Sequence, residues 1–237
     1  MKKQDIKTFL TLEFEKDRIL CVLRYGPKKS LSGLTPNDYD YLILLESRND
    51  HDYEKIRNIK NQIPKSEIFL EYKDYIESKG LNNYQRGCHG SYFLHILANS
   101  ECVYGNNYFK DKTNNLDKNK NIGELFSRIE EYFYRIQKEV LNNKVLNVNK
   151  IQKSILRIIT DLMIITGNLS FSDMHQVHYS DILELSIKKD FLGRKEFFKN
   201  TKEKFTKKEL SVYEVNSIVN ELSEMNVGLY SKKNESI

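Results

Sequence analysis

The segment at residues 37–45 places two carboxylates at the start of an apolar run. Its sequence, Asn-Asp-Tyr-Asp-Tyr-Leu-Ile-Leu-Leu, is typical of a β-strand that is buried along most of its length. Side chains alternate between the two faces of a strand, so Asp38 and Asp40 point the same way, with Cα atoms roughly 6.6–6.8 Å apart. Two carboxylates at this spacing can both reach one cation.

The cation that best fits these two aspartates is Mg²⁺. It takes oxygen ligands at about 2.0–2.1 Å and shares its shell between one or two carboxylates, waters and substrate phosphates. The competing interpretation is a solvated strand end whose acidic side chains resist edge-to-edge aggregation. Because Asp-x-Asp is a common string, the spacing alone does not decide between the two interpretations.

The segment before the aspartates has the composition of a phosphate site. Residues 19–25 form an apolar, β-prone run that stops at Gly26 and Pro27. The following turn carries basic and hydroxyl side chains: Lys28, Lys29, Ser30 and Ser32. A strand, a glycine turn with such groups and a strand that opens with Asp-x-Asp can hold a triphosphate against metal ions. The alternative for the turn is a flexible loop whose lysines are only solvated.

In these residues the chain resembles the polymerase-beta-type nucleotidyltransferase superfamily. The core of that family reads hydrophobic strand, Gly-Ser, variable loop, Asp-x-Asp and hydrophobic strand, and residues 23–26 and 37–44 match it. One position departs, because Pro27 stands where the family has serine and offers phosphate neither a hydroxyl nor a backbone N–H. Ser30 or Ser32 is a candidate substitute, and a catalytically weakened or inactive member is the alternative.

The resemblance also implies a third carboxylate on a later strand. The candidate strand is residues 67–72, Glu-Ile-Phe-Leu-Glu-Tyr, in which Glu67 and Glu71 share a face. The resemblance favours Glu67, with Glu71 as the alternative, while surface glutamates without a catalytic role are the competing interpretation. A segment with helical spacing precedes this strand and carries on one face Tyr53, Ile56, Ile59 and Ile63.

Residues 90–97 and 101–109 extend the match. Kanamycin-nucleotidyltransferase-like relatives have a helix followed by a short strand, which ends in an aromatic-glycine pair beside the nucleotide pocket. Tyr104 and Gly105 are such a pair here. The resemblance therefore covers about residues 15–110, with its segments in the order that the family has.

Length and charge are consistent with a nucleotide enzyme but do not demand one. A chain of 237 residues holds one large or two modest domains. Its three cysteines have no close pair and its N-terminus has no apolar signal core, so we expect a cytoplasmic protein. No apolar stretch has the length of a membrane span. The net charge of +5 allows an NTP or RNA partner, but the pI of 8.8 is below the value of about 9 typical of dedicated nucleic-acid binders.

The polar residues 111–121 are expected to form a linker or loop between two domains. Residues 1–110 would form the nucleotidyltransferase-like domain and residues 122–237 a helical bundle. Apolar residues recur at helical spacing over residues 122–140 and 151–165, and Gly167 is the expected C-terminal cap of the second helix. The fold class predicted from this pattern is α+β: a small mixed sheet flanked by helices, followed by an all-α, four-helix-like domain.

The last two helices of the predicted bundle are expected after residues 170–172 and at Thr206. Thr206 and Glu209 have the spacing of a capping box. Between them, residues 188–208 are rich in lysine with interleaved phenylalanines, which suggests either nucleic-acid binding or a solvated helix whose phenylalanines pack on the bundle. The second interpretation is the more common.

Three further groups of residues are weaker candidates. His175 and His178 could share a helix face, and Cys88, His89, His95 and Cys102 could be imagined as a zinc site, although the spacing matches no zinc framework. Asp161 lies within the most apolar helix, so it either pairs with Lys153 or Arg157 or acts as a general base.

Together, the residues and the resemblance predict a Mg²⁺-dependent nucleotidyltransferase, which moves a nucleoside monophosphate from an NTP to an acceptor hydroxyl on a small molecule, protein or RNA. One or two Mg²⁺ ions would be held by Asp38, Asp40 and Glu67, and Glu71 is the alternative third carboxylate. The residues expected to contact the nucleotide are Gly26, Lys28, Lys29, Ser30 and Ser32. The alternatives are an inactive scaffold protein of this fold and an RNA-associated module.

Overall fold

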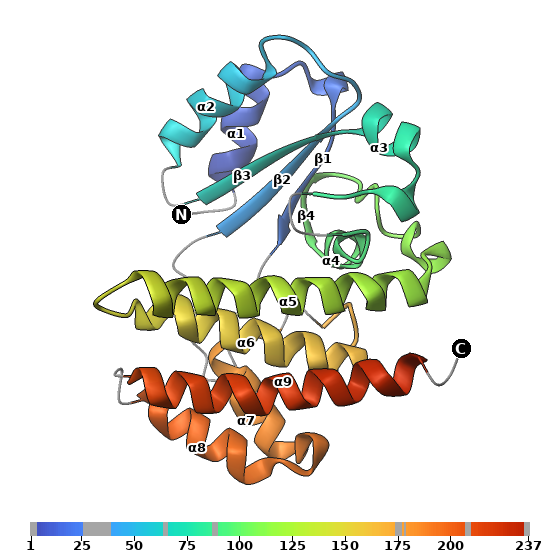
Figure 1. Cartoon of the computed structure of the whole chain (residues 1–237). Helices are drawn as coiled ribbons and strands as arrows, with labels where there is room; N and C mark the ends of the chain where they lie inside the picture. The colour runs from blue at the N-terminus through green and yellow to red at the C-terminus, as the bar shows by residue number, and fades with distance from the viewer. Residues whose placement is uncertain are drawn as a thin grey trace. The chain divides into compact units, whose positions relative to one another are not determined.

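The computed structural model describes residues 4–25, 39–63, 66–86, 90–173, 177, 179–206 and 210–234. These residues form two compact units, one extending to Asn121 and the other beginning at Ile122 (Figure 1). The N-terminal unit combines a sheet with helices and the C-terminal unit is helical, so the predicted α+β fold class is confirmed. None of the described helices is both long and apolar enough to cross a membrane.

The N-terminal unit contains a four-stranded mixed sheet with the strand order β3-β2-β1-β4. Its strands are β1 (Ile19–Tyr25), β2 (Tyr39–Leu45), β3 (Ser66–Tyr72) and β4 (Glu101–Gly105). β2 and β3 are parallel, whereas β1 is antiparallel to both β2 and β4. The predicted strands are therefore confirmed over their described residues. The end of β1 and the starts of β2 and β3 consequently lie at the same end of the strands, which we call the sheet edge.

Helices α1 (Gln4–Glu13) and α2 (Asp52–Gln62) supply the apolar layer on one sheet face (Figure 1). Ile6 and Leu10 of α1 and Ile59 of α2 join a core with alternate residues of β1 and β2, such as Val22 and Ile43. The helical spacing after β2 is confirmed for Ile59 but not for Tyr53, which is 63% exposed. Tyr53 follows the first residue of α2, where the helix turns this position toward solvent.

The opposite sheet face carries Leu23, Leu42 and Leu44, all fully buried. α4 (Phe93–Ala98) packs against β1 on this side, where the Phe93 ring meets Tyr25 edge-on at 5.5 Å. The remaining short elements of this unit are η1 (Lys16–Arg18), α3 (Lys73–Lys79), η2 (Leu81–Asn83) and η3 (Thr113–Asn115).

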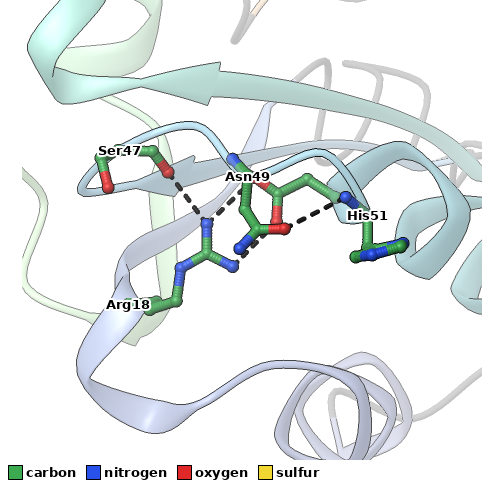
Figure 2. Close-up of polar contacts among 5 residues, drawn as sticks. Arg18, Ser47, Asn49 and His51 are labelled. Carbon is green, nitrogen blue, oxygen red and sulfur yellow. Dashed lines mark hydrogen bonds and ion pairs between the residues drawn. The ribbon is translucent and has the colours of Figure 1, made fainter.

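An ion pair fixes the connection between β2 and α2. The Arg18 guanidinium donates to both carboxylate oxygens of Asp52, at 2.8 and 3.0 Å, and to the Ser47 carbonyl at 2.9 Å. Figure 2 shows the Arg18 side chain directed at Ser47, with the His51 N–H donating to the Asn49 side chain. Burial of Asp52 opposes its ionisation, but Arg18 and the Asn49 N–H hold the pKa of the carboxyl below its ordinary value. The pair thus ties the start of α2 to the segment before β1.

The C-terminal unit contains five α-helices in its described residues, where the sequence predicts four. They are α5 (Lys118–Asn142), α6 (Val148–Ile165), α7 (Tyr179–Lys188), α8 (Lys195–Thr206) and α9 (Val212–Asn234), with η4 (Phe191–Gly193) before α8. The predicted cap of α6 is confirmed, because Gly167 has a positive φ of 72° and its N–H donates to the Ile164 carbonyl.

Two helices begin or end where the sequence does not place them. α5 begins at Lys118, inside the expected linker, because the Asp117 carboxylate accepts from the N–H groups of Asn119 and Lys120 and starts the helix. Thr206 ends α8 instead of opening a helix, and its hydroxyl donates to the Glu203 carbonyl.

The capping box lies five residues beyond the predicted one. The Ser211 hydroxyl accepts from the Glu214 N–H, while the Glu214 carboxylate accepts from the Ser211 N–H and hydroxyl. This reciprocal pair opens α9, which begins at Val212.

A buried ion pair joins α5 to α6. Arg128 donates to both oxygens of Asp161, with Nε 2.7 Å from Oδ2, and the two side chains are only 3% and 0% exposed. Asp161 therefore pairs with a residue of another helix, whereas the sequence predicts a partner on its own helix, Lys153 or Arg157. Of these two, Arg157 lies near enough for its charge to oppose the rise in the pKa of Asp161 that burial causes. Because both carboxylate oxygens are occupied by a buried guanidinium, we assign Asp161 to folding and do not retain the general-base interpretation.

The first prediction concerns Gly105, the glycine of the aromatic-glycine pair. Gly105 has a φ of 69°, and a Cβ there would lie 2.1 Å from the Leu20 carbonyl oxygen of β1. Gly105→Ala should therefore lower the free energy of unfolding by about 3 kcal/mol or more, measured by urea titration. Gly167→Ala is the control, since that glycine has φ 72° with open space around it and should lose only about 1 kcal/mol. Equal losses of unfolding free energy would show that crowding against the Leu20 carbonyl of β1 adds nothing to the cost of the substitution.

The second prediction concerns the Arg128–Asp161 pair. Asp161→Asn leaves a guanidinium buried without its counter-charge and should cost about 3–5 kcal/mol of unfolding free energy. Glu131→Gln is the control, because Glu131 pairs with Arg135 at an exposed site and its loss should cost less than about 0.5 kcal/mol. A wild-type urea midpoint for Asp161→Asn would contradict the assigned role.

Candidate functional site

Two carboxylates lie side by side at the edge of the sheet where β2 and β3 begin. Asp40 is the second residue of β2 and Glu67 the second residue of β3, and the two are partners in the parallel register. Adjacent strands are roughly 4.8 Å apart, and partners in register project from the same face. Asp40 is partly exposed and Glu67 is exposed, so the face is open to a ligand at this point.

Tyr25, the last residue of β1, completes the row. It is the register partner of Asp40 on the other side from Glu67. Burial raises the pKa of the Tyr25 hydroxyl, and the charges of Asp40 and Glu67 raise it further, while the Arg86 guanidinium acts in the opposite direction. These four ionisable groups are therefore close enough to influence one another.

Glu71 lies on the same face of β3 but away from the edge. Its register partner is Leu44, a fully buried residue, and its own side chain is 14% exposed. The Tyr84 hydroxyl donates to Glu71 Oε1 at 3.1 Å, and Arg86 Nε lies 3.6 Å from the same oxygen. Burial raises the pKa of the Glu71 carboxyl despite these two neighbours. The structure thus brings Glu67, and not Glu71, next to Asp40.

Arg86 lies over Phe69, the residue between the two glutamates on this face of β3, and near Phe93 of α4. Its guanidinium carbon is 3.7 Å from the centre of the Phe69 ring and 5.6 Å from that of Phe93. Tyr25 also contacts Phe69, with ring centres 6.0 Å apart. Sequence reasoning did not identify Tyr25, Tyr84 or Arg86 as members of this face. The end of the β1 run could have indicated Tyr25, whereas the other two reach the face from an irregular segment.

The predicted nucleotide contacts lie outside the described residues. This applies to Asp38, the first aspartate of the pair, and to every residue expected to hold the triphosphate: Gly26, Lys28, Lys29, Ser30 and Ser32. Pro27 lies in the same segment. Their roles stay predictions, supported by the fact that β1 ends and β2 begins at the edge that carries Asp40.

The neighbouring Arg24 and Glu101 form an ion pair at the same edge. They are partners in the antiparallel register of β1 and β4, and their side chains are 20% and 16% exposed. The pair lies on the face opposite the carboxylates, because Arg24 and Tyr25 alternate along β1. It joins β4 to the end of β1.

The histidine and cysteine candidates do not form a metal site in the described residues. His95 Nε2 lies 3.2 Å from the Asn121 amide nitrogen, and Asn121 in turn accepts from the buried Ser91 hydroxyl at 2.8 Å. Cys102 donates to the carbonyls of Tyr104 and Gly105. Cys88, His89, His175 and His178 lie outside the described residues. Within the described part of the chain, no three His, Cys, Asp or Glu side chains are placed to hold one metal.

In its described residues, the basic segment at residues 188–208 fits a solvated helix whose phenylalanines pack on the bundle better than a nucleic-acid binding surface. Phe191 and Phe198 are buried in the helical unit and contact each other at 5.7 Å. Several of the lysines and arginines pair with nearby glutamates: Lys199 with Glu196, Lys202 with Glu184, and Arg194 with Glu221. These rings are therefore not available to stack on bases.

Comparison with known proteins shows the fold. No protein-family model matches this sequence, and no curated protein sequence matches it. A solved structure similar to it is spectinomycin adenyltransferase AAD(9) from Enterococcus faecialis, with ATP and spectinomycin. The TM-score is 0.56 at 14% identity, over 94% of this chain and 97% of that one.

A second similar structure is a nucleotidyltransferase-like protein from Exiguobacterium sibiricum. It matches with a TM-score of 0.37 at 9% identity, over 95% of this chain and 74% of that one. The likeness to the adenyltransferase extends through both units, so the predicted resemblance is confirmed at the level of fold: the chain has a nucleotidyltransferase fold followed by a helical region.

Proposed function

We propose that this chain is a Mg²⁺-dependent nucleotidyltransferase that transfers a nucleoside monophosphate from an NTP to an acceptor hydroxyl. The observation that carries the proposal is the pairing of Asp40 with Glu67 at the sheet edge where β1 ends. It is supported by the likeness of fold, over nearly the whole chain, to an adenyltransferase whose crystal structure includes ATP.

The described residues suit a Mg²⁺ ion. Mg²⁺ prefers oxygen ligands and is commonly held by one or two carboxylates together with substrate phosphates. Asp40 and Glu67 are neighbouring, accessible carboxylates on one face, and Asp38 would add a third through the alternation of β2. One or two bound Mg²⁺ ions would supply charge neutralisation for the phosphates and activation of the attacking hydroxyl.

The chain's own contribution is positioning. The acceptor oxygen forms a bond to the α-phosphorus while the bond to pyrophosphate breaks, and the hydroxyl proton passes to a base or to water. Glu67, on the edge strand β3, would lie on the acceptor side of Asp40, and the turn after β1 would hold the triphosphate on the other side. In such transfers most of the catalysis comes from orientation and electrostatic stabilisation.

The acceptor remains one of three classes, a small molecule, a protein hydroxyl or an RNA end. The adenyltransferase with the same fold was crystallised with spectinomycin, so a small molecule is the first class that we would test. Pro27 supports the main alternative, an inactive protein that retains the fold, because the family has serine at this position.

The third prediction tests the nucleotide site. Mg²⁺ with ATP should raise the unfolding midpoint of the wild type, by the equivalent of about 2.7 kcal/mol when ATP is at 100 times its Kd. Asp38→Asn/Asp40→Asn should abolish this stabilisation while leaving the midpoint of the free protein within a few degrees. All four NTPs should be compared with and without Mg²⁺. No stabilisation by any NTP would favour the inactive alternative.

The fourth prediction separates the two glutamates. Glu67→Gln should reduce the Mg²⁺-dependent part of ATP binding about 10-fold or more, because it removes a charged oxygen ligand beside Asp40. Glu71→Gln is the matched control on the same strand face and should leave this binding within about twofold. Isothermal titration calorimetry with and without Mg²⁺ measures both. The opposite ranking would make Glu71 the third carboxylate.

A further inference from the structure

Arg86 is a cation on the carboxylate face that the transfer chemistry above does not use. Arg86 lies two residues after Tyr84 in the sequence. Its guanidinium lies over Phe69, the residue of β3 between Glu67 and Glu71 on the same face. Residues two apart on a strand are separated by roughly 6.6–6.8 Å, so Arg86 is about one such step from the Asp40–Glu67 row. A ligand bound at that row is therefore within reach of a long, charged side chain.

The hydrogen-bonding capacity of Arg86 is only partly used by its described neighbours, one of which is the Tyr25 hydroxyl. Its Nε lies 3.6 Å from Glu71 Oε1, beyond the range of a hydrogen bond, so the contact is an ion pair without a directed N–H. Within the described part of the chain, its Nη1 is buried and has no hydrogen-bond acceptor. Leaving such a buried donor without an acceptor is unfavourable. A bound anion that accepts from this guanidinium would remove that cost.

Arg86 is held in place by stacking, which keeps its planar fork intact. The ring of Phe69 lies 3.7 Å below the guanidinium carbon, and Phe93 forms a second wall. Arginine on an aromatic face keeps its in-plane N–H donors available, and a planar fork matches two oxygens of a phosphate. The Arg86 side chain is 13% exposed, so a ligand on this face can reach part of the fork.

The surrounding charge also favours an anion once metal is present. Asp40 and Glu67 are the carboxylates proposed to bind Mg²⁺, and bound cations would cancel their repulsion of a phosphate. Glu71 is the remaining described carboxylate near Arg86, and it meets the guanidinium only at 3.6 Å. The guanidinium is then only partly compensated by its own neighbours.

We propose that Arg86 binds a phosphate group of a substrate beside Asp40 and Glu67, an inference that rests on the proposed transferase function. The phosphate belongs either to the NTP or to an acceptor that carries a phosphate near its hydroxyl. Both sources present the same chemistry to the guanidinium, two oxygens of a dianionic or monoanionic group.

The test measures the Kd of Mg·ATP and, separately, of inorganic phosphate by isothermal titration calorimetry. Arg86→Gln should raise at least one of these Kd values about 10-fold or more, since it removes a charge-assisted hydrogen bond. Arg86→Lys, which keeps the charge but loses the fork, should give an intermediate value. Arg48→Gln is the matched control, because Arg48 also lies over an aromatic ring, that of Tyr72 at 5.2 Å, on the other sheet face.

The two ligands identify the source of the phosphate. A loss of Mg·ATP affinity in Arg86→Gln assigns the contact to the nucleotide, while a loss for inorganic phosphate alone assigns it to the acceptor side. If Arg86→Gln binds both ligands like the wild type, and Asp40→Asn still loses Mg·ATP, the Arg86 inference is overturned and the transferase proposal stands. Arg86-dependent phosphate binding without Asp40-dependent ATP binding would overturn the transferase proposal instead. A wild type that binds neither ligand overturns both.

A measurement on the wild type covers the case in which Arg86→Gln does not fold. The ¹⁵N-labelled protein shows arginine Nε–H resonances, and that of Arg86 is identified by its absence in Arg86→Lys. Adding phosphate or Mg·ATP should shift this resonance with the Kd found by calorimetry. An Arg86 resonance that does not move while the ligand binds elsewhere would contradict the proposal.

Discussion

The parallel pairing of β2 with β3 is the constraint on which the candidate site depends. Their register aligns Asp40 with Glu67, and a shift by one residue would turn Glu67 to the face covered by α1 and α2. The register is fixed by burial on that covered face, where Tyr41 and Ile43 pack together with Ile68 and Leu70. The apolar core therefore determines the position of two carboxylates that take no part in it.

The two faces of this sheet differ in polarity and in what covers them. One is sealed by α1 and α2 and carries apolar side chains of every central strand. The other is apolar under α4 but becomes polar toward the edge, from Leu42 to Asp40 on β2 and from Phe69 to Glu67 on β3. Tyr25, Arg86 and Phe93 occupy the transition between these regions. A charged ligand can approach the edge while the rest of the face stays buried.

Local patterns in the sequence predict the strands and the capped end of α6, because their determinants are neighbours along the chain. Ile19–Tyr25 is a continuous apolar run, and Gly167 supplies the positive φ at the end of its helix. The predicted start of α9 is misplaced because Thr206–Glu209 and Ser211–Glu214 both have the spacing of a capping box, and the structure shows the reciprocal hydrogen bonds of such a box at Ser211 and Glu214. Spacing alone does not choose between two equivalent caps.

The remaining errors come from partners that are distant in sequence. Asp161 was assigned a partner one or two turns away on its own helix, whereas its partner Arg128 comes from α5. Lys120 helps to anchor the start of α5 through Asn83, a contact that no property of the polar segment 111–121 indicates. Asp40 and Glu67 were found because each opens a strand, but their adjacency needs the sheet order β3-β2-β1-β4.

Glu67 and Glu71 show how one strand face gives two identical side chains different chemistry. Glu67, at the open edge, keeps the hydration that an ionised metal ligand needs before it binds. Glu71, two pleats further in, loses that hydration, and burial raises the pKa of its carboxyl even with Arg86 and Tyr84 beside it. Because burial makes its ionised form costly, Glu71 is poorly suited to bind a metal held at Asp40 and Glu67. It lies instead beside the Arg86 guanidinium. On this argument the outer glutamate is the one suited to a metal, while the inner one is an ion-pair partner of Arg86.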